Sequence, residues 1–338
     1  METVLIAAGV IIVATAVTWV GSAWLERGAD DLAVHYRLPD VVQGTIVVAI
    51  GSSFPELSTT VISTAIHGEF ELGMSAIVGS AIFNILVIPA LSGISGGRLA
   101  GSRQLVYKDA LFYLTSVAVL LLAFSFALIY NPLPDGELVG RLDRPIAACP
   151  LLLYGVYIFL QQQETEEHWQ EERTGSAPSI SVMKSWLLVL AGLVLIVAGV
   201  EGLIRSVIAL GETLGTPTFL WGATVVAAAT SLPDAFISIR TARQGDTDVS
   251  LGNVLGSNIF DLLVAIPAGV LIAGATLVDY GVAAPLMAVL TVATIVLFAA
   301  LRTDLTLTRR ECYVLLALYA AFIGWLVLET IGVTAWVR

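Results

Sequence analysis

Long apolar runs separated by short polar stretches repeat along the whole chain. A helix needs about 20 mostly apolar residues to cross the hydrocarbon core of a membrane, and ten runs reach that length. They cover residues 3–25, 39–66, 70–96, 108–130, 143–162, 183–208, 216–241, 248–275, 279–301 and 311–336. The first run lacks a basic leader and is too long for a signal peptide, so we expect it to stay as a span. The pattern predicts an all-α polytopic membrane protein with ten transmembrane helices.

Four of these runs, the second, third, seventh and eighth, carry polar residues in the middle of an apolar segment, and they match in two pairs. The stretch 39-PDVVQGTIVVAIGSSFPE-56 aligns without gaps on 217-PTFLWGATVVAAATSLPD-234, and 79-GSAIFN-84 then aligns on 256-GSNIFD-261. The alignment places Ser53 on Ser231, Pro55 on Pro233, Glu56 on Asp234, Ser80 on Ser257 and Asn84 on Asp261. General apolarity would not align proline, serine and an acid together. The chain therefore contains two copies of one unit.

Each copy holds five of the ten predicted spans. An odd number of spans places the second copy upside down relative to the first, which is the inverted-repeat plan of secondary transporters. We expect a first five-helix repeat over residues 1–162, with its motif region at 39–92, and a second over 183–338, with its motif region at 217–270. Residues 163–182 are acidic and rich in turn formers, which predicts a cytoplasmic linker.

The basic residues of the loops predict the orientation in the membrane. Loops after odd-numbered spans hold Arg27, Arg37, Arg98, Arg103, Lys108, Arg173, Lys184, Arg240, Arg243, Arg302, Arg309 and Arg310. The opposite side holds Arg141, Arg144, Arg205 and Arg338, which makes twelve against four of the sixteen basic residues. Because cytoplasmic loops are enriched in Lys and Arg, both termini are expected on the non-cytoplasmic side.

Composition narrows the class further. Hydrophobic residues make up 57% of the 338, the mean hydropathy is +0.89 and the net charge is −11. No basic patch is present to meet phosphates, so nucleic-acid binding is disfavoured. The acidic, lysine-poor composition suits a salt-rich habitat. Cys149 and Cys312 lie too far apart in sequence for a metal-ligand motif and are expected to be ordinary small apolar residues.

The prolines of the two copies predict broken helices in spans 2 and 7. Proline removes a backbone donor and clashes with the carbonyl four residues earlier. Freed carbonyls are tolerated inside a membrane only where they face a cavity or a polar partner. A carboxylate at mid-membrane depth costs about 2.5–3.5 kcal/mol even on lenient insertion scales, so it usually has a task. A purely structural proline kink is the alternative, and the matched second copy argues against it.

The side chains that the two copies could offer as cation ligands all carry oxygen atoms. The side chains concerned are Ser52, Ser53, Glu56, Ser80, Asn84, Thr230, Ser231, Asp234, Ser257 and Asp261. Hard oxygen ligands suit calcium, magnesium or manganese, whereas zinc and copper prefer nitrogen or sulfur. Calcium also accepts backbone carbonyls, which broken helices supply. Sodium and potassium accept the same carbonyl and hydroxyl oxygens. The two copies thus predict a buried cation site. Gly79 and Gly256 are expected to let neighbouring helices approach closely.

At these motifs the sequence resembles the calcium/cation antiporter superfamily, and within it the sodium/calcium exchangers, including their potassium-dependent branch. The resemblance implies that Glu56 and Asp234 are the central calcium ligands. It further implies that Ser53, Ser80, Ser231 and Ser257 bind sodium, with Ser52 and Thr230 close by, that Asn84 and Asp261 complete the site, and that the carbonyls of Ala49 and Ala227 contribute. One departure is Ala81, because the second copy has Asn258 at that position.

The resulting hypothesis is an integral protein of the cell membrane that exchanges sodium for calcium by alternating access, with potassium co-transport left open. Its partners are inorganic cations and the lipid bilayer, and it needs no permanently bound cofactor. Calcium/proton exchange by the same acids is the alternative. An intramembrane aspartyl protease is disfavoured because its Gly-x-Gly-Asp motif is absent from the chain. A passive channel would need a continuous pore, which the pattern does not indicate.

Overall fold

The computed structural model describes residues 2–36, 49–97, 99–133, 138–168 and 181–334. Within these residues, nine helices are long and apolar enough to cross a membrane. They are α1 (Glu2–His35), α4 (Phe70–Gly96), η3 with α5 (Leu105–Asp109 and Ala110–Tyr130), α6 (Arg144–His168), α7 (Val182–Leu214), α8 with η4 and α9 (Thr218–Trp221, Gly222–Val226 and Ala227–Gln244), α10 with η5 and α11 (Thr247–Phe260, Asp261–Ala265 and Ile266–Ala273), α12 (Tyr280–Leu301) and α13 (Arg309–Thr330).

The remaining predicted span is an interrupted helix. It consists of α2 (Ala49–Ser52), α3 (Phe54–Val61) and the π-helical turn η2 (Ile62–Ile66), and its expected beginning at 39–48 lies outside the described residues. Two short antiparallel pairs connect helix ends. In the first, β1 (Leu99–Ala100) pairs with β4 (Thr306–Leu307), and in the second, β2 (Val139–Asp143) pairs with β3 (Ala275–Asp279). The predicted all-α membrane architecture is confirmed.

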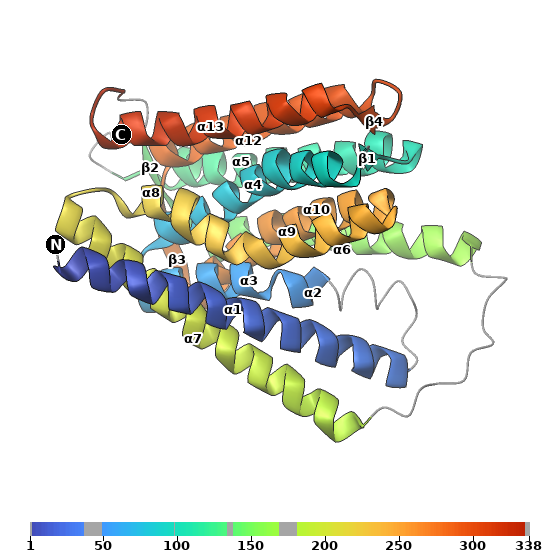
Figure 1. Ribbon diagram of the computed structural model, residues 1–338. Helices are drawn as coiled ribbons and strands as arrows, with labels where there is room; N and C mark the ends of the chain where they lie inside the picture. Colours follow the sequence, from blue (N-terminus) through green and yellow to red (C-terminus); the bar gives the residue numbers. More distant parts are fainter. Residues whose placement is uncertain (1, 37–48, 98, 134–137, 169–180, 335–338) are drawn as a thin grey trace.

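Helices α1 and α7 run antiparallel along one edge of the bundle (Figure 1). A Cβ added at Gly21 would lie 2.9 Å from the Gly192 carbonyl oxygen, so the two backbones touch at this point. The flanking contacts repeat with the same spacing. A Cβ at Gly28 would lie 2.7 Å from the Ser185 carbonyl oxygen, and one at Gly199 would lie 2.9 Å from that of Ala14. These two contacts are equivalent. Gly28 and Gly199 are 171 residues apart, and so are Ala14 and Ser185, so the inverted repeat relates positions with this offset in α1 and α7.

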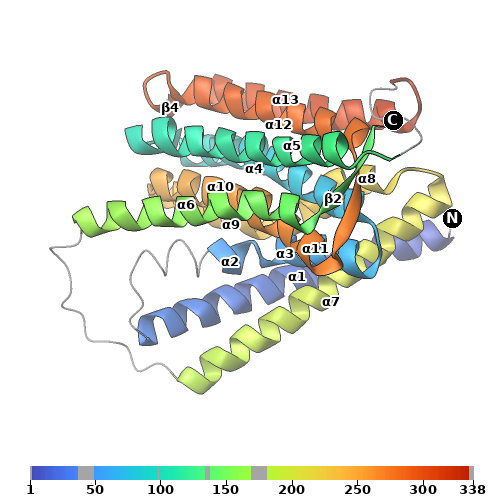
Figure 2. The same cartoon turned by 180° about the vertical axis from the view of Figure 1, so that it is seen from behind.

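Helix α4 is the most buried of the nine spans and lies inside the bundle, with α9, α10, α12 and α13 around it (Figure 1, Figure 2). Gly79 of α4 allows this packing, since a Cβ there would lie 2.4 Å from the Ala223 carbonyl oxygen of η4. The prediction of close approach is therefore confirmed for Gly79. It is wrong for Gly256, because no atom of the described residues comes within 4 Å of a Cβ built there.

The helix break predicted at each proline occurs in span 2 but not in span 7. Span 2 breaks at Ser53, which has φ −91° and ψ 8°, and Pro55 then occupies the first turn of α3, where proline is tolerated. Span 7 stays helical through Pro233, which lies inside α9. Its irregularity is the π-helical turn η4 (Gly222–Val226), upstream of the proline. Single π-turns inside α-helices are rare, and they are frequently found at functional sites.

The number of membrane crossings decides at which end of the bundle the first helix begins and the last helix ends. The beginning of α1 and the end of α13 lie at the same end of the bundle (Figure 1), as an even number of crossings requires. Helix α6 runs on to His168, so the first six residues of the expected linker at 163–182 are helical, and residues 169–180 lie outside the described part.

Candidate cation-binding site

The polar residues of both motifs converge from α2, α3, α4, α9, α10 and η5. Their side chains are each at most 2% exposed, and the set comprises Ser52, Ser53, Glu56, Ser80, Asn84, Thr230, Ser231, Asp234, Ser257 and Asp261. Ala227, the first residue of α9, is equally buried. Ala49 is the first residue of α2. Because the motif residues come from both repeats, the site lies where the two repeats meet.

Four serines join the two repeats through a pair of equivalent hydrogen bonds. The hydroxyl oxygens of Ser53 and Ser257 are 2.9 Å apart, and those of Ser80 and Ser231 are 2.6 Å apart. Ser53 aligns on Ser231 and Ser80 on Ser257, so these are the same contact formed twice. The internal symmetry inferred from the sequence is therefore present in the side-chain geometry of the site.

The buried carboxylates of the site have few hydrogen-bond partners. The Ser257 hydroxyl donates to Oδ2 of Asp234 at 2.9 Å. Among the described residues, the other Asp234 oxygen and both carboxylate oxygens of Glu56 and of Asp261 are buried without a hydrogen-bond partner. A buried acceptor without a partner costs free energy. A cation bound among these oxygens would remove that cost.

The acids alone do not form a metal cluster. Within the part of the chain that the structure describes, no three His, Cys, Asp or Glu side chains gather closely enough to hold an ion by themselves. Hydroxyl, amide and carbonyl oxygens must therefore supply part of any cation shell, as calcium and sodium accept. The Thr230 hydroxyl donates to the carbonyls of Val226 at 3.2 Å and Ala227 at 3.4 Å, so these backbone oxygens lie at the level of the site.

Asn258 and Tyr113 were not among the predicted site residues. The Asn84 amide nitrogen donates to Oδ1 of Asn258 at 3.0 Å. The Asn258 amide nitrogen in turn donates to the Tyr113 hydroxyl at 3.2 Å and to the Ala81 carbonyl at 3.3 Å. This network fixes which end of the Asn84 amide faces the site, because its nitrogen is used and its Oδ1 has no partner in the described residues. Asn84 thus presents an oxygen, the atom a cation needs.

The sequence carried a signal for Asn258 but none for Tyr113. Asn258 lies inside the motif 256-GSNIFD-261, at the one position where the first copy has alanine instead. Tyr113 lies on α5, outside both motifs, and is fully buried. Only the packing of α5 against the site brings its hydroxyl into the network.

An inverted pair of five-helix repeats with a buried, oxygen-lined site between them defines a secondary ion transporter. The comparison with protein families identifies which one: residues 6–162 and 184–328 match the sodium/calcium exchanger protein family. The chain belongs to that family. It is a membrane-embedded transporter of the exchanger type and not an enzyme.

Individual relatives agree with this assignment. The chain is 28% identical over 249 residues to an uncharacterized membrane protein of Methanocaldococcus jannaschii, covering 74% of this chain and 76% of that protein. It is 25% identical over 319 residues to human sodium/potassium/calcium exchanger 5, covering 66% of this chain and 61% of the relative.

Solved structures share the fold. The sodium-calcium exchanger NCX_Mj, soaked with Na⁺ and Sr²⁺, superposes with a TM-score of 0.63 at 25% identity and covers 95% of this chain and 99% of its own. An H⁺/Ca²⁺ exchanger, CAX, superposes with a TM-score of 0.70 at 14% identity over 96% of this chain and 87% of its own, and shows the fold alone.

Proposed function

We propose that this chain exchanges Na⁺ for Ca²⁺ across the cell membrane by alternating access to one buried site. The observation that carries the proposal is the set of unpaired carboxylate oxygens on Glu56, Asp234 and Asp261, buried beside the two symmetric serine pairs. Carboxylates favour a divalent ion, and the hydroxyl and carbonyl oxygens around them suit monovalent Na⁺. The family membership and the NCX_Mj likeness support this pairing of ions.

Each residue then has a role in the exchange. Glu56 and Asp234 are the calcium ligands, and Asn84 and Asp261 complete their shell. Sodium binds at the four serines Ser53, Ser80, Ser231 and Ser257, with Ser52, Thr230 and the carbonyls of Ala49 and Ala227 nearby. The same acids serve both ions, so bound Ca²⁺ and bound Na⁺ exclude each other. This exclusion couples the two fluxes.

The repeats supply the movement. We assign the first repeat to residues 1–162, the linker to 163–182 and the second repeat to 183–338, with both termini on the non-cytoplasmic side. Movement of one bundle relative to the other would expose the site to the two sides of the membrane in turn. Potassium co-transport is left open in this proposal, and the likeness to human sodium/potassium/calcium exchanger 5 supports testing it.

Calcium/proton exchange is the second candidate. Three buried acids without full hydrogen bonding are able to carry protons as well as cations. The fold shared with the H⁺/Ca²⁺ exchanger CAX keeps this candidate in view. The four serine hydroxyls at the site favour sodium, because proton carriage does not require them.

The deciding experiment is Ca²⁺ uptake into proteoliposomes loaded with Na⁺. Uptake driven by the outward Na⁺ gradient is expected for the native chain, and Glu56→Gln should reduce it to the protein-free background. Glu212→Gln is the matched control, because Glu212 lies exposed in the last turns of α7, away from the site, and it should transport like the native chain. Adding external K⁺ tests co-transport.

Two outcomes would contradict the assignment. Native-like uptake by the Glu56→Gln protein would remove Glu56 from the calcium site. Uptake that follows an imposed pH gradient and ignores Na⁺ would replace sodium by the proton as the driving ion.

A further inference from the structure

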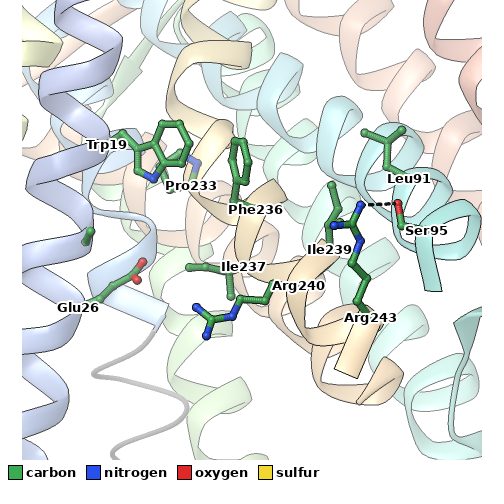
Figure 3. Close-up of a pocket in the computed structure, with 11 residues that line it drawn as sticks. Trp19, Glu26, Leu91, Ser95, Pro233, Phe236, Ile237, Ile239, Arg240 and Arg243 are labelled. Carbon is green, nitrogen blue, oxygen red and sulfur yellow. Dashed lines mark hydrogen bonds between the residues drawn. The ribbon is translucent and has the colours of Figure 1, made fainter. Parts of the chain in front are cut away.

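A cavity of about 710 Å³ lies beside the candidate site, between α1, the end of α4 and the second half of α9 (Figure 3). Its walls are largely apolar, and Trp19 of α1 stacks on Phe236 of α9 with ring centroids 4.4 Å apart. It contains three charged side chains, Glu26, Arg240 and Arg243. The cavity lies toward the bundle end at which α4 and α9 finish, which is the cytoplasmic end in the proposed orientation.

Glu26 and Pro233 bring the cavity next to the motifs of both repeats. Pro233 lines the cavity and directly precedes Asp234 of the site. Glu26 lies against the other motif, since a Cβ built at Gly51 would lie 3.6 Å from Cγ of Glu26. Glu26 therefore lies in the wall of this cavity, next to the motif of the first repeat.

The Glu26 carboxylate has no charge partner in the described part of the chain. Its Oε1 is buried without a hydrogen bond, and neither Arg240 nor Arg243 forms a salt bridge with it there. Arg243 instead donates from Nη2 to the Ser95 hydroxyl at 3.5 Å. The Arg240 side chain extends toward α1 without reaching the carboxylate (Figure 3). A partly buried carboxylate left unpaired is unfavourable unless it takes up a proton or binds a cation.

Glu26 also breaks the internal symmetry of the transporter. The packing of α1 on α7 relates positions 171 residues apart, and this places Val197 at the counterpart of Glu26. Val197 is exposed and apolar. An acid therefore lies beside the site on α1 and has no counterpart on α7, so its effect should be confined to one side of the membrane.

The geometry points to Glu26 as an outer cation-binding station that receives Ca²⁺ or Na⁺ from the cytoplasmic cavity before the ion reaches Glu56 and Asp234. This inference rests on the proposed exchange function and adds a residue and a sidedness to it. Arg240 opposes the station, because a guanidinium in the same cavity repels an entering cation.

The test is Ca²⁺/Ca²⁺ exchange, which needs neither a Na⁺ nor a proton gradient, in everted and in right-side-out membrane vesicles. Radiolabelled Ca²⁺ reports the half-saturating concentration at each face. Glu26→Gln should raise that concentration about three- to tenfold at the cytoplasmic face, as the loss of one nearby opposite charge in a partly hydrated cavity implies. The value at the other face and the maximal rate should stay near those of the native chain.

Two further variants separate the station from a structural role. Arg240→Gln should shift the cytoplasmic value in the opposite direction, whereas a structural Glu26–Arg240 pair would make both variants change it alike. Asp246→Asn is the matched control, because it removes one exposed charge on the same side and its side chain caps no helix. Absence of exchange in the native chain would overturn the proposed function itself. Native exchange with an unshifted Glu26→Gln protein, or an equal shift at both faces, would overturn the outer station alone.

Discussion

The four motif serines connect the two repeats directly. Each pair contributes a hydrogen bond between helices inside the membrane, and such bonds are worth about 0.6 to 2 kcal/mol. Their hydroxyl oxygens keep spare acceptor capacity, because a hydroxyl donates once and accepts twice. The same atoms are therefore able to hold the repeats together and to bind a cation.

Asn258 acts on the site through Asn84. Replacing Asn258 with alanine leaves the Asn84 amide nitrogen and the Tyr113 hydroxyl without their partner, and Asn84 is then free to turn its oxygen away from the site. We expect Asn258→Ala to raise the half-saturating Ca²⁺ concentration about three- to tenfold, the equivalent of one lost buried hydrogen bond. Equilibrium Ca²⁺ binding to the purified protein measures this directly.

The matched control is Asn253→Ala on the same helix, whose amide donates to Ser238 outside the site. It should leave Ca²⁺ affinity unchanged. Tyr113→Phe removes one bond of the network and should give a smaller shift in the same direction. Native affinity in the Asn258→Ala protein would show that the network does not orient Asn84.

The site residues that the sequence predicted are those that occur in both copies of the internal repeat. Glu56, Asp234 and the four serines were predicted because each has a counterpart in the other copy. Asn258 aligns with an alanine in the other copy, so it has no matching counterpart. Tyr113 and Glu26 lie on helices that carry no motif. Their relation to the site depends on which helices pack together, and a single sequence does not reveal that.

Among the elements, α1 and α7 depend on each other most closely. Their backbones meet at Gly21 and Gly192, where a methyl group would lie 2.9 Å and 2.7 Å from backbone atoms of the other helix. Within a membrane, lipid solvates apolar side chains as well as a neighbouring helix does, so close backbone packing has to supply the attraction. Small residues at the contact are therefore required.

Gly21→Ala should separate α1 from α7. The added methyl collides with backbone and cannot rotate away, and overpacking of this kind costs about 1–3 kcal/mol. We expect a lower thermal unfolding midpoint in detergent and slower Ca²⁺ exchange. Gly9→Ala is the matched control on the same helix, because no atom of the described residues lies within 4 Å of its added methyl. A Gly21→Ala protein that melts like the native chain would show that the helices have room to move apart without cost.

The sequence predicted that both spans depart from a regular α-helix, but it did not predict the form and position of each departure. Proline in both motifs indicated a break in each, and span 2 breaks at Ser53, two residues before Pro55. In α9 the helix passes through Pro233, and the π-turn at Gly222–Val226 forms where η4 packs on Gly79 of α4. Proline removes one hydrogen bond, but the tertiary contacts decide whether the helix breaks there or adjusts elsewhere.

At the scale of the whole molecule, one inverted symmetry relates three features of the structure. It relates the glycine contacts of α1 and α7, the two serine pairs of the site, and the positions of the acids that both repeats contribute. A site between inverted repeats is equally accessible, in principle, to either face of the membrane. The symmetry is broken where Ala81 is the counterpart of Asn258 and where Val197 is the counterpart of Glu26. At these positions the two repeats, and the two faces of the membrane, are expected to differ.

The basic residues near the helix ends predict the orientation of the whole molecule in the membrane. The sequence places twelve of the sixteen basic residues in or next to the segments that follow odd-numbered spans, several of them inside helix ends. The start of α1 and the end of α13 lie at the opposite end of the bundle (Figure 1). Because basic loops stay in the cytoplasm, alkaline phosphatase fused after Arg338 should be active and a fluorescent protein fused there should be dark. Fusions after Thr308, in the loop that follows α12, are the control and should behave in the opposite way. Fluorescence from the fusion at Arg338 would reverse the orientation and move the Glu26 cavity to the outer face of the membrane.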